Sequence, residues 1–555
     1  MSFSVKKNVL QTVAMLKAYG IRHVVVSPGS RNAPLMQTFS QEPSFECHVV
    51  VDERNAAFYA LGIIQCTRKP VAVCCTSGTA LLNFAPAVAE AFYQQLPLIV
   101  VSADRSPEWI GQMDGQTIPQ PDALGVMVKK AVNLPEIITE QDEWFCNRLL
   151  NETLIICTAD APGPVHINIP VSEPLFDYSV EKLPEVKLIN YPKPHKAVDI
   201  HPFTKKWNSS SKRMIIVGQL FKSEKLTGIL EKLVQQGDCI VITEHLSNCV
   251  SPLFISNFDA LLYAIPDGKK NDFAPDLVIT LGGHIVSKRL KHFLRANKPK
   301  SHWQISQTGE VVDLYQSLTD LVETDNEKFL NDLYYTISAD EQKPFFDLWK
   351  NTSFKIAEPS SEIPFSDILA TGSFLKELPP HSVLHLANSS TVRNVQLYPL
   401  DKSVNVFCNR GTNGIESTLP SAVGFASVYD GVVYLIIGDL SFFYGLNALW
   451  NISHIKNLRI LLVNNGGGGI FHLLPGLNKA PSLKQYVAAT HDTTAKGWAN
   501  AAGLTYLSAN NKQELQQNLS QFVDETIQQS ILFEVTTDMD ISKQAFKDYY
   551  HSLKI

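Results

Sequence analysis

Two short polar segments, each directly behind an apolar run, have the residue types needed to bind a metal ion together with a phosphate group. Gly438-Asp439-Leu440-Ser441 follows the apolar run 432–437, and Asn465 stands 26 residues after Asp439, directly before a run of four glycines. A carboxylate and an amide oxygen are hard ligands for Mg²⁺, and glycine backbone can add a carbonyl ligand and approach phosphate oxygens closely. A helix that begins after Ser441 would point its N-terminus at the anion. The spacing therefore predicts a Mg²⁺ site that bridges to a diphosphate.

Each half of this pattern also has an ordinary structural interpretation. A Gly-Asp pair can be a plain turn between a strand and a helix, and four glycines can be a flexible loop. Both segments follow apolar strands, however, and open α/β sheets bind their ligands at the ends of such strands. The two segments together therefore favour the interpretation as a metal and diphosphate site.

Glu53 is the candidate for acid–base chemistry. It follows the apolar run 49–51, which we expect to be a buried strand. A carboxylate at the end of a buried strand loses solvation and can keep the raised pKa that proton transfer requires. The alternative is that Asp52 and Glu53 form a solvated pair at the start of a helix. We favour the functional interpretation because the diphosphate motif occurs in the same chain.

Short apolar strands alternate with helical patterns along the chain and place these segments at strand ends. In the first 180 residues the strands are expected at 24–26, 71–75, 98–101 and 165–169. Continuous apolar strands between helices are typical of parallel sheets covered on both faces. Residues 176–213 and 358–364 contain several prolines and serines and are expected to be linkers. We therefore predict an α/β protein with mostly parallel sheets flanked by helices, in three domains at 1–180, 212–345 and 360–555.

The composition limits the class of protein. The 555 residues carry a formal net charge of −6, with 45% hydrophobic and 18% charged residues, which excludes disordered and fibrous proteins. The mild acidic balance argues against a nucleic-acid partner. Nine cysteines without a C-x-x-C pair do not indicate a disulfide scaffold and fit a reducing, cytoplasmic location. No apolar run approaches about 18 residues, so no membrane span is expected. The 15 histidines show no metal-ligand spacing, and His166 is assigned a structural role.

Several longer segments resemble one enzyme family. They are S-P-G-S-R-N-A-P-L (27–35), D-E-R-N-A-A-F-Y-A-L-G (52–62), T-S-G-T-A (76–80), S-A-D-R (102–105), G-P-V-H-I-N-I-P (163–170), N-R-G-T-N-G-I-E (409–416), and Asn388 and Ser389 with Arg393. Together with Gly438-Asp439 and Asn464-Asn465, these segments are similar to the 2-succinyl-5-enolpyruvyl-6-hydroxy-3-cyclohexene-1-carboxylate (SEPHCHC) synthases. These synthases are thiamine diphosphate-dependent enzymes of menaquinone biosynthesis. The resemblance covers essentially the whole chain and is weakest in the middle. Leu440 departs from the glycine usual in this family, but the metal-binding atoms are unchanged.

The resemblance implies a fold, an activity and cofactors. The domains would be a pyrimidine-binding domain, a Rossmann-like middle domain and a diphosphate-binding domain. Members decarboxylate 2-oxoglutarate and add the resulting carbanion to isochorismate in a 1,4-addition, so the chain would be a transferase. The cofactors would be thiamine diphosphate and Mg²⁺ or Mn²⁺. A homodimer or homotetramer is implied, since the cofactor lies between the first domain of one subunit and the third of another. The alternatives are another thiamine diphosphate-dependent 2-oxo acid decarboxylase or carboligase, and a non-catalytic homologue that binds nucleotide or anion.

The resemblance also implies roles for single residues. Glu53 would hydrogen-bond the aminopyrimidine N1′, and the metal would be bound by Asp439, Asn465 and Gly467. The oxo-acid would be held by Ser389, Arg393 and Arg410. Isochorismate would be held by Ser30, Arg31, Arg105, Gln116, Lys288 and Arg289. The cofactor would contact Glu53, Gly78, Ser389, Ile415, Gly438, Asp439, Leu440, Ser441, Asn465, Gly467, Gly468, Ile470 and Phe471.

The cations in this set have a chemical reason to be there. Substrates with several carboxylates need positive groups that do not titrate, and a guanidinium fork grips a carboxylate with two hydrogen bonds. The alternative for each cation is an ordinary surface charge, and it is strongest for Lys288 and Arg289, which begin an expected basic helix. For Ile415, the alternative to a cofactor contact is an ordinary position in the hydrophobic core. Gly469 departs from the polar residue expected at its position, which removes a side-chain contact but no metal ligand.

Overall fold

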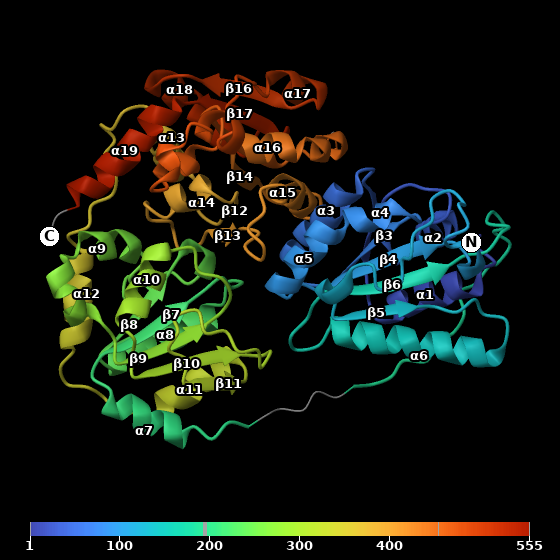
Figure 1. Cartoon of the computed structure of the whole chain (residues 1–555), viewed down its shortest axis with the longest axis horizontal. Coiled ribbons are helices and arrows are strands. Elements are labelled where there is room, and N and C mark those ends of the chain that lie inside the picture. Colours follow the sequence, from blue (N-terminus) through green and yellow to red (C-terminus); the bar gives the residue numbers. More distant parts are fainter. Residues whose placement is uncertain (1, 192–196, 453, 554–555) are drawn as a thin grey trace.

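The computed structural model contains three α/β units that follow one another along the chain (Figure 1). The structure describes residues 2–191, 197–452 and 454–553. Pro192 and Pro194 of the expected linker, and the last two residues of the expected third domain, lie outside these ranges. Each unit holds one sheet, and neighbouring strands in the described residues pair in parallel throughout. The predicted α/β fold with parallel sheets is confirmed, while the domain boundaries at 1–180, 212–345 and 360–555 stay a prediction.

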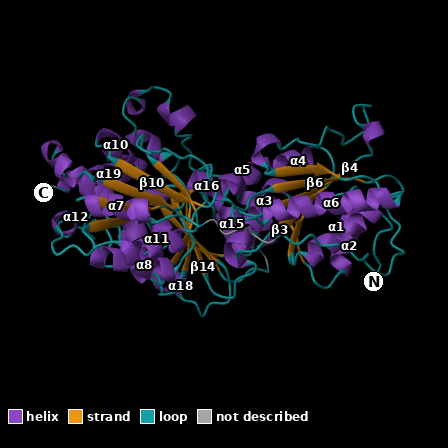
Figure 2. Ribbon diagram, turned by 90° about the horizontal axis from the view of Figure 1, so that it is seen from below, coloured by secondary structure: helices purple, strands orange, loops and turns teal. Residues whose placement is uncertain are grey.

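The first unit has the strand order β2-β1-β3-β4-β6-β5. Every residue of β3, β4 and β6 is buried, because helices cover both faces of the sheet (Figure 2). Its elements are α1 (Lys7–Ala18), β1 (His23–Val26), α2 (Ala33–Gln41), β2 (Glu46–Val49), α3 (Glu53–Thr67), β3 (Val71–Cys75), α4 (Thr79–Asn83), α5 (Ala85–Gln94), β4 (Leu98–Asp104), β5 (Lys130–Asn133), α6 (Glu140–Cys157) and β6 (Val165–Pro170).

The strand before Glu53 differs from the prediction. We expected a buried strand at 49–51, but β2 ends at Val49, and the side chains of Val49 and Val51 are exposed. The physical reason is that β2 is an edge strand that pairs only with β1. Its apolar character is therefore weaker than that of the central strands, and the expectation was wrong for this element.

The middle unit has the strand order β11-β10-β9-β7-β8. Its strands β7 and β8 are buried at every residue, as their apolar sequences predict. Its elements are α7 (His201–Ser209), β7 (Arg213–Val217), α8 (Glu224–Gln236), β8 (Cys239–Thr243), α9 (Phe258–Ala264), β9 (Leu277–Leu281), α10 (Lys288–Ala296), β10 (Ser301–Ser306), β11 (Asp320–Glu323), α11 (Asn326–Thr336) and α12 (Pro344–Ser353).

The third unit repeats the topology of the first. Its order, β13-β12-β14-β15-β17-β16, matches that of the first sheet strand for strand. Its elements are α13 (Asp367–Glu377), β12 (Val383–Leu386), α14 (Ser390–Val395), β13 (Asn405–Phe407), α15 (Thr418–Ala426), β14 (Val433–Gly438), α16 (Asp439–Tyr444), β15 (Leu458–Asn464), α17 (Lys496–Ala501), β16 (Thr505–Ala509), α18 (Lys512–Val523), β17 (Ile531–Thr536) and α19 (Met539–Ser552).

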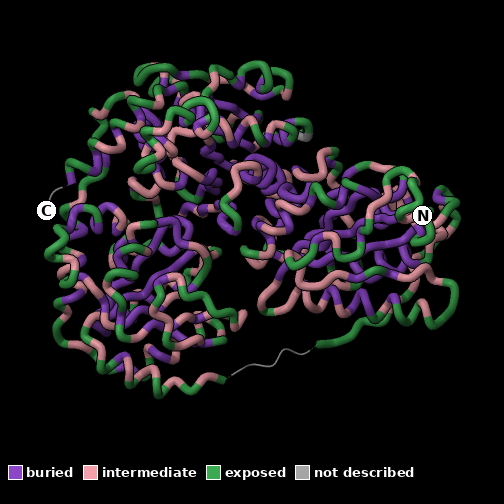
Figure 3. The backbone as a smooth tube through the Cα atoms, viewed as in Figure 1, coloured by how far each residue is buried: buried purple, intermediate pink, exposed green. Residues whose placement is uncertain are grey.

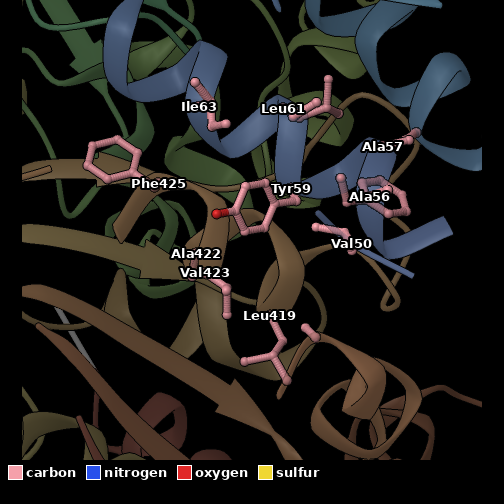
Figure 4. Packing of buried hydrophobic residues seen from close by; sticks show 14 of the residues in the cluster. Val50, Ala56, Ala57, Tyr59, Leu61, Ile63, Leu419, Ala422, Val423 and Phe425 are labelled. Atoms are coloured by element: carbon pink, nitrogen blue, oxygen red, sulfur yellow. The ribbon is translucent and has the colours of Figure 1, made fainter. Parts of the chain in front are cut away.

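Helices α3 and α15 join the first unit to the third. A Cβ added at Gly62 would lie 1.9 Å from the Ser421 carbonyl oxygen, and one at Gly424 would lie 2.1 Å from that of Tyr59. Glycine on each helix therefore permits a very close crossing. The apolar side chains around this crossing belong to one core cluster that includes residues of both helices (Figure 4). In Figure 3 the backbone in this region is coloured as buried. This contact fixes the start of α3, and with it Glu53, relative to the third unit.

No helix among the described residues is both long enough and apolar enough to cross a membrane.

Candidate active site

Asp439 lies at the carboxyl end of β14, with its side chain oriented by the backbone. The Leu440 N–H donates to Asp439 Oδ1 at 2.6 Å, and the Gly467 N–H donates to Asp439 Oδ2 at 2.8 Å. Because β14 pairs with β15, Asp439 and the segment after Asn464 meet at the same edge of the sheet. Burial raises the pKa of Asp439, while these two N–H groups oppose the shift. A cation at this position would stabilise the ionised carboxylate.

Asn465 lines the same pocket as Asp439 and has an unpaired side-chain oxygen. Its Nδ2 donates to Asp367 Oδ2 at 2.7 Å, whereas its Oδ1 is buried and accepts no hydrogen bond from the described part of the chain. A buried amide oxygen without a partner is costly unless something outside the protein satisfies it. Asp367 thus leaves Oδ1 as the free atom of the Asn465 amide. A hard cation suits such an oxygen when a carboxylate lines the same pocket.

The glycine run provides the rest of the cradle. Gly467 has φ +147°, and a Cβ there would lie 2.6 Å from the Ala488 carbonyl oxygen, so only glycine fits. At Gly469 a Cβ would lie 3.1 Å from Asn465 Nδ2. The departure at Gly469 therefore leaves room around the amide that we expect to bind the metal. The residues fit a divalent cation with a diphosphate.

The pocket at this edge gathers most of the cofactor residues predicted in the third unit. Ile415 is half-buried in its wall. The others that line it are Ser389, Gly438, Asp439, Leu440, Ser441, Asn465, Gly467, Gly468 and Phe471. Ile470 lines the adjoining pocket, which shares Asp367 and Asn465 with this one. These residues come from four separate segments and meet only because the strands are adjacent.

Glu53 lies in a different pocket of the same chain. Its pocket is lined by residues of the first unit, among them Gly78 and Gln116. Gly78 has φ +85°, and a Cβ there would lie 3.2 Å from the Gln116 carbonyl oxygen. Among the described residues none lines both this pocket and that of Asp439. Glu53 and the predicted metal ligands therefore lie in separate pockets of the described chain.

Arg393 and Arg410 form a positive centre next to the pocket of Asp439. Asn388 Oδ1 accepts a hydrogen bond from Arg410 Nη1 at 2.7 Å, and the Ser389 carbonyl accepts one from Arg393 Nη1. Burial and the charge of Arg410 lower the pKa of Arg393. Ser389 has φ +72°, a strained conformation for serine of the kind that occurs at binding sites. Two neighbouring guanidinium groups that repel each other favour an anionic ligand between them.

The cations of the first unit already have partners. Arg31 is buried, pairs with Glu173 at 2.9 Å and donates to the Val171 carbonyl. Arg105 pairs with Asp114 at 3.4 Å and donates to the Gly115 carbonyl at 3.2 Å. Ser30 is exposed near Arg31 in the sequence. A substrate carboxylate at this position would compete with these protein carboxylates.

Lys288 and Arg289 lie in the middle unit, at the start of α10. Arg289 pairs with Asp259 and its guanidinium lies 4.2 Å from the centre of the Tyr550 ring, while Lys288 is exposed. The structure does not bring them into the pocket of Glu53. The pKa of Lys291, one turn later, is lowered by burial and also by the charges of Arg410 and Arg393, so Lys291 belongs to the positive centre of the third unit.

Three further residues of the site had not been predicted. Asp367 holds Asn465 as described, and His491 Nε2 lies 3.5 Å from Asp439 Oδ2. Glu90, which is buried in α5, accepts hydrogen bonds from Gly411 N at 2.7 Å and from Thr412 N at 2.6 Å. Local sequence carries no sign of these roles, because each partner lies far along the chain.

Three family profiles match most of the chain. Residues 9–125 match the thiamine pyrophosphate enzyme, N-terminal TPP binding domain, and residues 184–365 match the middle domain of thiamine pyrophosphate. Residues 389–535 match the thiamine pyrophosphate enzyme, C-terminal TPP binding domain.

Curated relatives and solved structures agree with these profiles. The chain is 48% identical over 561 residues to the 2-succinyl-5-enolpyruvyl-6-hydroxy-3-cyclohexene-1-carboxylate synthase of Bacteroides thetaiotaomicron, covering 100% of both chains. It is 46% identical to that of Bacteroides fragilis with the same coverage, and 38% identical to that of Flavobacterium psychrophilum over 96% of each chain. The crystal structure of benzoylformate decarboxylase from Polynucleobacter necessarius superposes with a TM-score of 0.74 at 17% identity, covering 96% of this chain and 99% of that one. This last likeness concerns the fold.

Proposed function

Because the chain belongs to the SEPHCHC synthase family of thiamine diphosphate-dependent enzymes, we propose that it decarboxylates 2-oxoglutarate and adds the resulting carbanion to isochorismate. The curated relatives named above, which match over nearly their whole length, carry this activity in their names. A thiamine diphosphate-dependent decarboxylase or carboligase with another acceptor is not favoured by these relatives. A non-catalytic homologue is not favoured either, since Glu53, Asp439 and Asn465 are all present.

One observation carries the proposal that the cofactor is bound with a metal. It is the buried, unpaired Oδ1 of Asn465, a residue that lines the same pocket as Asp439. Asp439, Asn465 and the Gly467 carbonyl would bind Mg²⁺ or Mn²⁺, and the glycine backbone would contact the diphosphate. When bound, thiamine diphosphate supplies a nucleophilic carbon and an electron sink for 2-oxo acid decarboxylation. The Glu53 carboxyl would hold the proton shared with N1′ of the aminopyrimidine.

The separation of the Glu53 pocket from the Asp439 pocket supports a homo-oligomer as part of the same proposal. The Glu53 pocket and the Asp439 pocket have no lining residue in common within one chain. A second copy of the chain would complete each site by bringing its own Glu53 pocket against the Asp439 pocket of the first. A homodimer is the smallest assembly that satisfies both sites, and a homotetramer repeats the same contact. We also propose that the protein is located in the cytoplasm.

We assign the two substrates to different groups of cations. Arg393 and Arg410, with Ser389, would hold the carboxylates of 2-oxoglutarate, because their guanidinium groups adjoin the metal pocket. Arg31 and Arg105, with Ser30 and Gln116, would hold isochorismate, and Lys288 and Arg289 would join them from the second copy of the chain. The pairing of Arg31 with Glu173 and of Arg105 with Asp114 would then exchange for substrate carboxylates.

The experiment is a mass-spectrometric product assay on the purified full chain. SEPHCHC should form only with 2-oxoglutarate, isochorismate, thiamine diphosphate and Mg²⁺ all present. Arg393→Ala and Arg410→Ala should slow the release of CO₂ from 2-oxoglutarate. Arg31→Ala and Arg105→Ala should keep that step and lose transfer to isochorismate. Release of CO₂ with no isochorismate-derived product under any condition would indicate a simple decarboxylase and refute the proposed function.

A further inference from the structure

Two histidines and a glutamate converge at the edge of the first sheet, away from both active-site pockets. In the parallel pairing of β1 with β2, His23 lies opposite Glu46 and Val25 lies opposite His48. Residues two apart on a strand share a face, so the three side chains project on the same side. The distances are 3.3 Å from His23 Nδ1 to His48 Nε2, 3.7 Å from His23 Nδ1 to Glu46 Oε2, and 3.8 Å from His48 Nε2 to Glu46 Oε1.

The two ring nitrogens lie as far apart as two ligands of a tetrahedral metal. A metal about 2.0–2.1 Å from each donor keeps the donors roughly 3.3–3.4 Å apart, and the ring nitrogens are 3.3 Å apart. Glu46 presents a different oxygen to each ring, so its carboxylate must rotate and move closer before one oxygen can join both rings at a metal. Glu46 can do so, because its side chain is 44% exposed and not held by packing.

A hydrogen bond between the rings or an ion pair with Glu46 is the competing explanation. The ion pair needs a protonated ring, yet burial lowers the pKa of His48 to about 4 and also lowers the pKa of His23. Arg22 and Lys69, and the neighbouring His454, add positive charge that disfavours protonation further, against the opposing charge of Glu46. These shifts disfavour the ion pair. A hydrogen bond between the rings uses the same two nitrogens that a metal would bind, and the Zn²⁺ titration below separates these two explanations.

The remaining ring nitrogen of His48 also has the partner that a metal ligand needs. Tyr59 Oη lies 3.3 Å from His48 Nδ1. When Nε2 binds a metal, Nδ1 carries the proton and donates it to this oxygen, which fixes the ring orientation. Tyr59 lies on α3 and packs against α15 (Figure 4). Its contact with His48 therefore holds the His48 ring against the place where these helices cross.

We propose that His23, Glu46 and His48 form a binding site for a first-row divalent metal of the Zn²⁺ type, with one coordination position open to solvent. Two imidazole nitrogens and one carboxylate select Zn²⁺ and its neighbours over Mg²⁺, which prefers oxygen ligands. The site is separate from that of Asp439 in ligand chemistry and position. The sequence showed no such spacing because His23 and His48 come from different strands, which only the sheet brings together.

The test is Zn²⁺ titration of the untagged full chain against a chromophoric chelator. Millimolar Mg²⁺ with thiamine diphosphate is present throughout, so that the oxygen site of Asp439 is occupied. One equivalent of Zn²⁺ should bind and raise the melting temperature. His48→Gln should weaken binding at least about 100-fold, since even outer partners of metal ligands contribute about 10- to 100-fold. Tyr59→Phe should weaken it by about tenfold on the same basis.

Two further variants separate the site from general effects. Glu46→Gln removes a partly exposed ligand and leaves the folded core intact, so it should bind Zn²⁺ weakly and keep the melting temperature of the zinc-free protein. His292→Gln, which changes an exposed histidine on α10, should bind Zn²⁺ like the unmodified chain. Co²⁺ bound at the site should show the intense visible absorption of tetrahedral coordination. Equal Zn²⁺ affinity in the unmodified chain, His48→Gln and Glu46→Gln would overturn the proposal.

Discussion

Replacing Glu90 with glutamine removes one charge from the contact between the first unit and the segment 409–416. In the folded chain the two carboxylate oxygens of Glu90 accept hydrogen bonds from Gly411 N, from Thr412 N and from Thr412 Oγ1, at 2.6–2.7 Å. The same segment carries Arg410, which we assign to the oxo-acid, and Ile415, which lines the pocket of Asp439. Glu90 therefore acts as a positioning residue that holds this segment from the opposite unit.

The size of the effect follows from the contacts. A hydrogen bond to a charged group contributes about 1.5–3 kcal/mol, and one between neutral groups about 0.5–1.5 kcal/mol. Glutamine keeps one acceptor for Gly411 N at neutral strength and turns an amide N–H₂ toward Thr412. The Gly411 bond then loses about 1 kcal/mol, and the Thr412 N–H, which belongs to an exposed residue and can turn to water, loses a hydrogen bond to a charged group that contributes about 1.5–3 kcal/mol. A total of about 3 kcal/mol corresponds to an effect on the order of 100-fold.

The assay is kcat/KM for 2-oxoglutarate together with hydrogen exchange of the backbone amides in 409–416. Glu90→Gln should lower kcat/KM by 10- to 100-fold and speed exchange in this segment, with thiamine diphosphate still bound. Glu42→Gln is the matched control, because Glu42 is also a buried glutamate of the first unit but pairs with Lys17, at 3.0 Å. Unchanged exchange in 409–416, or an equal loss of kcat/KM in both variants, would refute the reasoning.

Three further predictions concern the site and the core. Glu53→Gln should bind thiamine diphosphate but exchange its C2 proton slowly, because an amide cannot share a proton with N1′ as a carboxylic acid does; an NMR exchange rate like that of the unmodified chain would contradict the role. Asp439→Ala should lose the Mg²⁺-dependent part of cofactor binding in calorimetry, and unchanged affinity would exclude Asp439 as a ligand. Burial lowers the pKa of His166 to about 4, below its ordinary value of 6.5, so the unfolded chain binds the extra proton between these values and stability is lost as the pH falls through this range. At pH 5 this loss is about 2 kcal/mol, from ~1.4 kcal/mol per pKa unit; His166→Gln should lose less on going from pH 7.5 to pH 5 in urea denaturation, and an identical loss would contradict the assignment.

The elements that could be predicted from the sequence are those whose burial is complete. Strands β3, β7 and β14 read as continuous apolar runs because both of their faces are covered. Edge strands do not: β5 (Lys130–Asn133) is partly exposed and mixed in polarity, and β2, which spans Glu46–Val49, was expected at 49–51. The strand ends were predictable for the same reason as the strands. A polar residue that interrupts a buried apolar run, as Asp439 does, marks the edge of the sheet.

What the sequence could not provide is the orientation of these end residues, because orientation comes from partners far along the chain. Asn465 was predicted to be a ligand from its position after a strand, but the choice of its free atom depends on Asp367, 98 residues earlier. Arg410 was identified from its motif, but the segment that carries it is held by Glu90, 321 residues before Gly411. His23 and His48 show the same principle for a site without any motif, since their nitrogens meet only through the register of β1 and β2. Residue type at a strand end thus indicates which chemistry is possible. The geometry that makes it work is set by polar contacts between segments far apart in the sequence, and substitutions there should impair function even though they touch neither cofactor nor substrate.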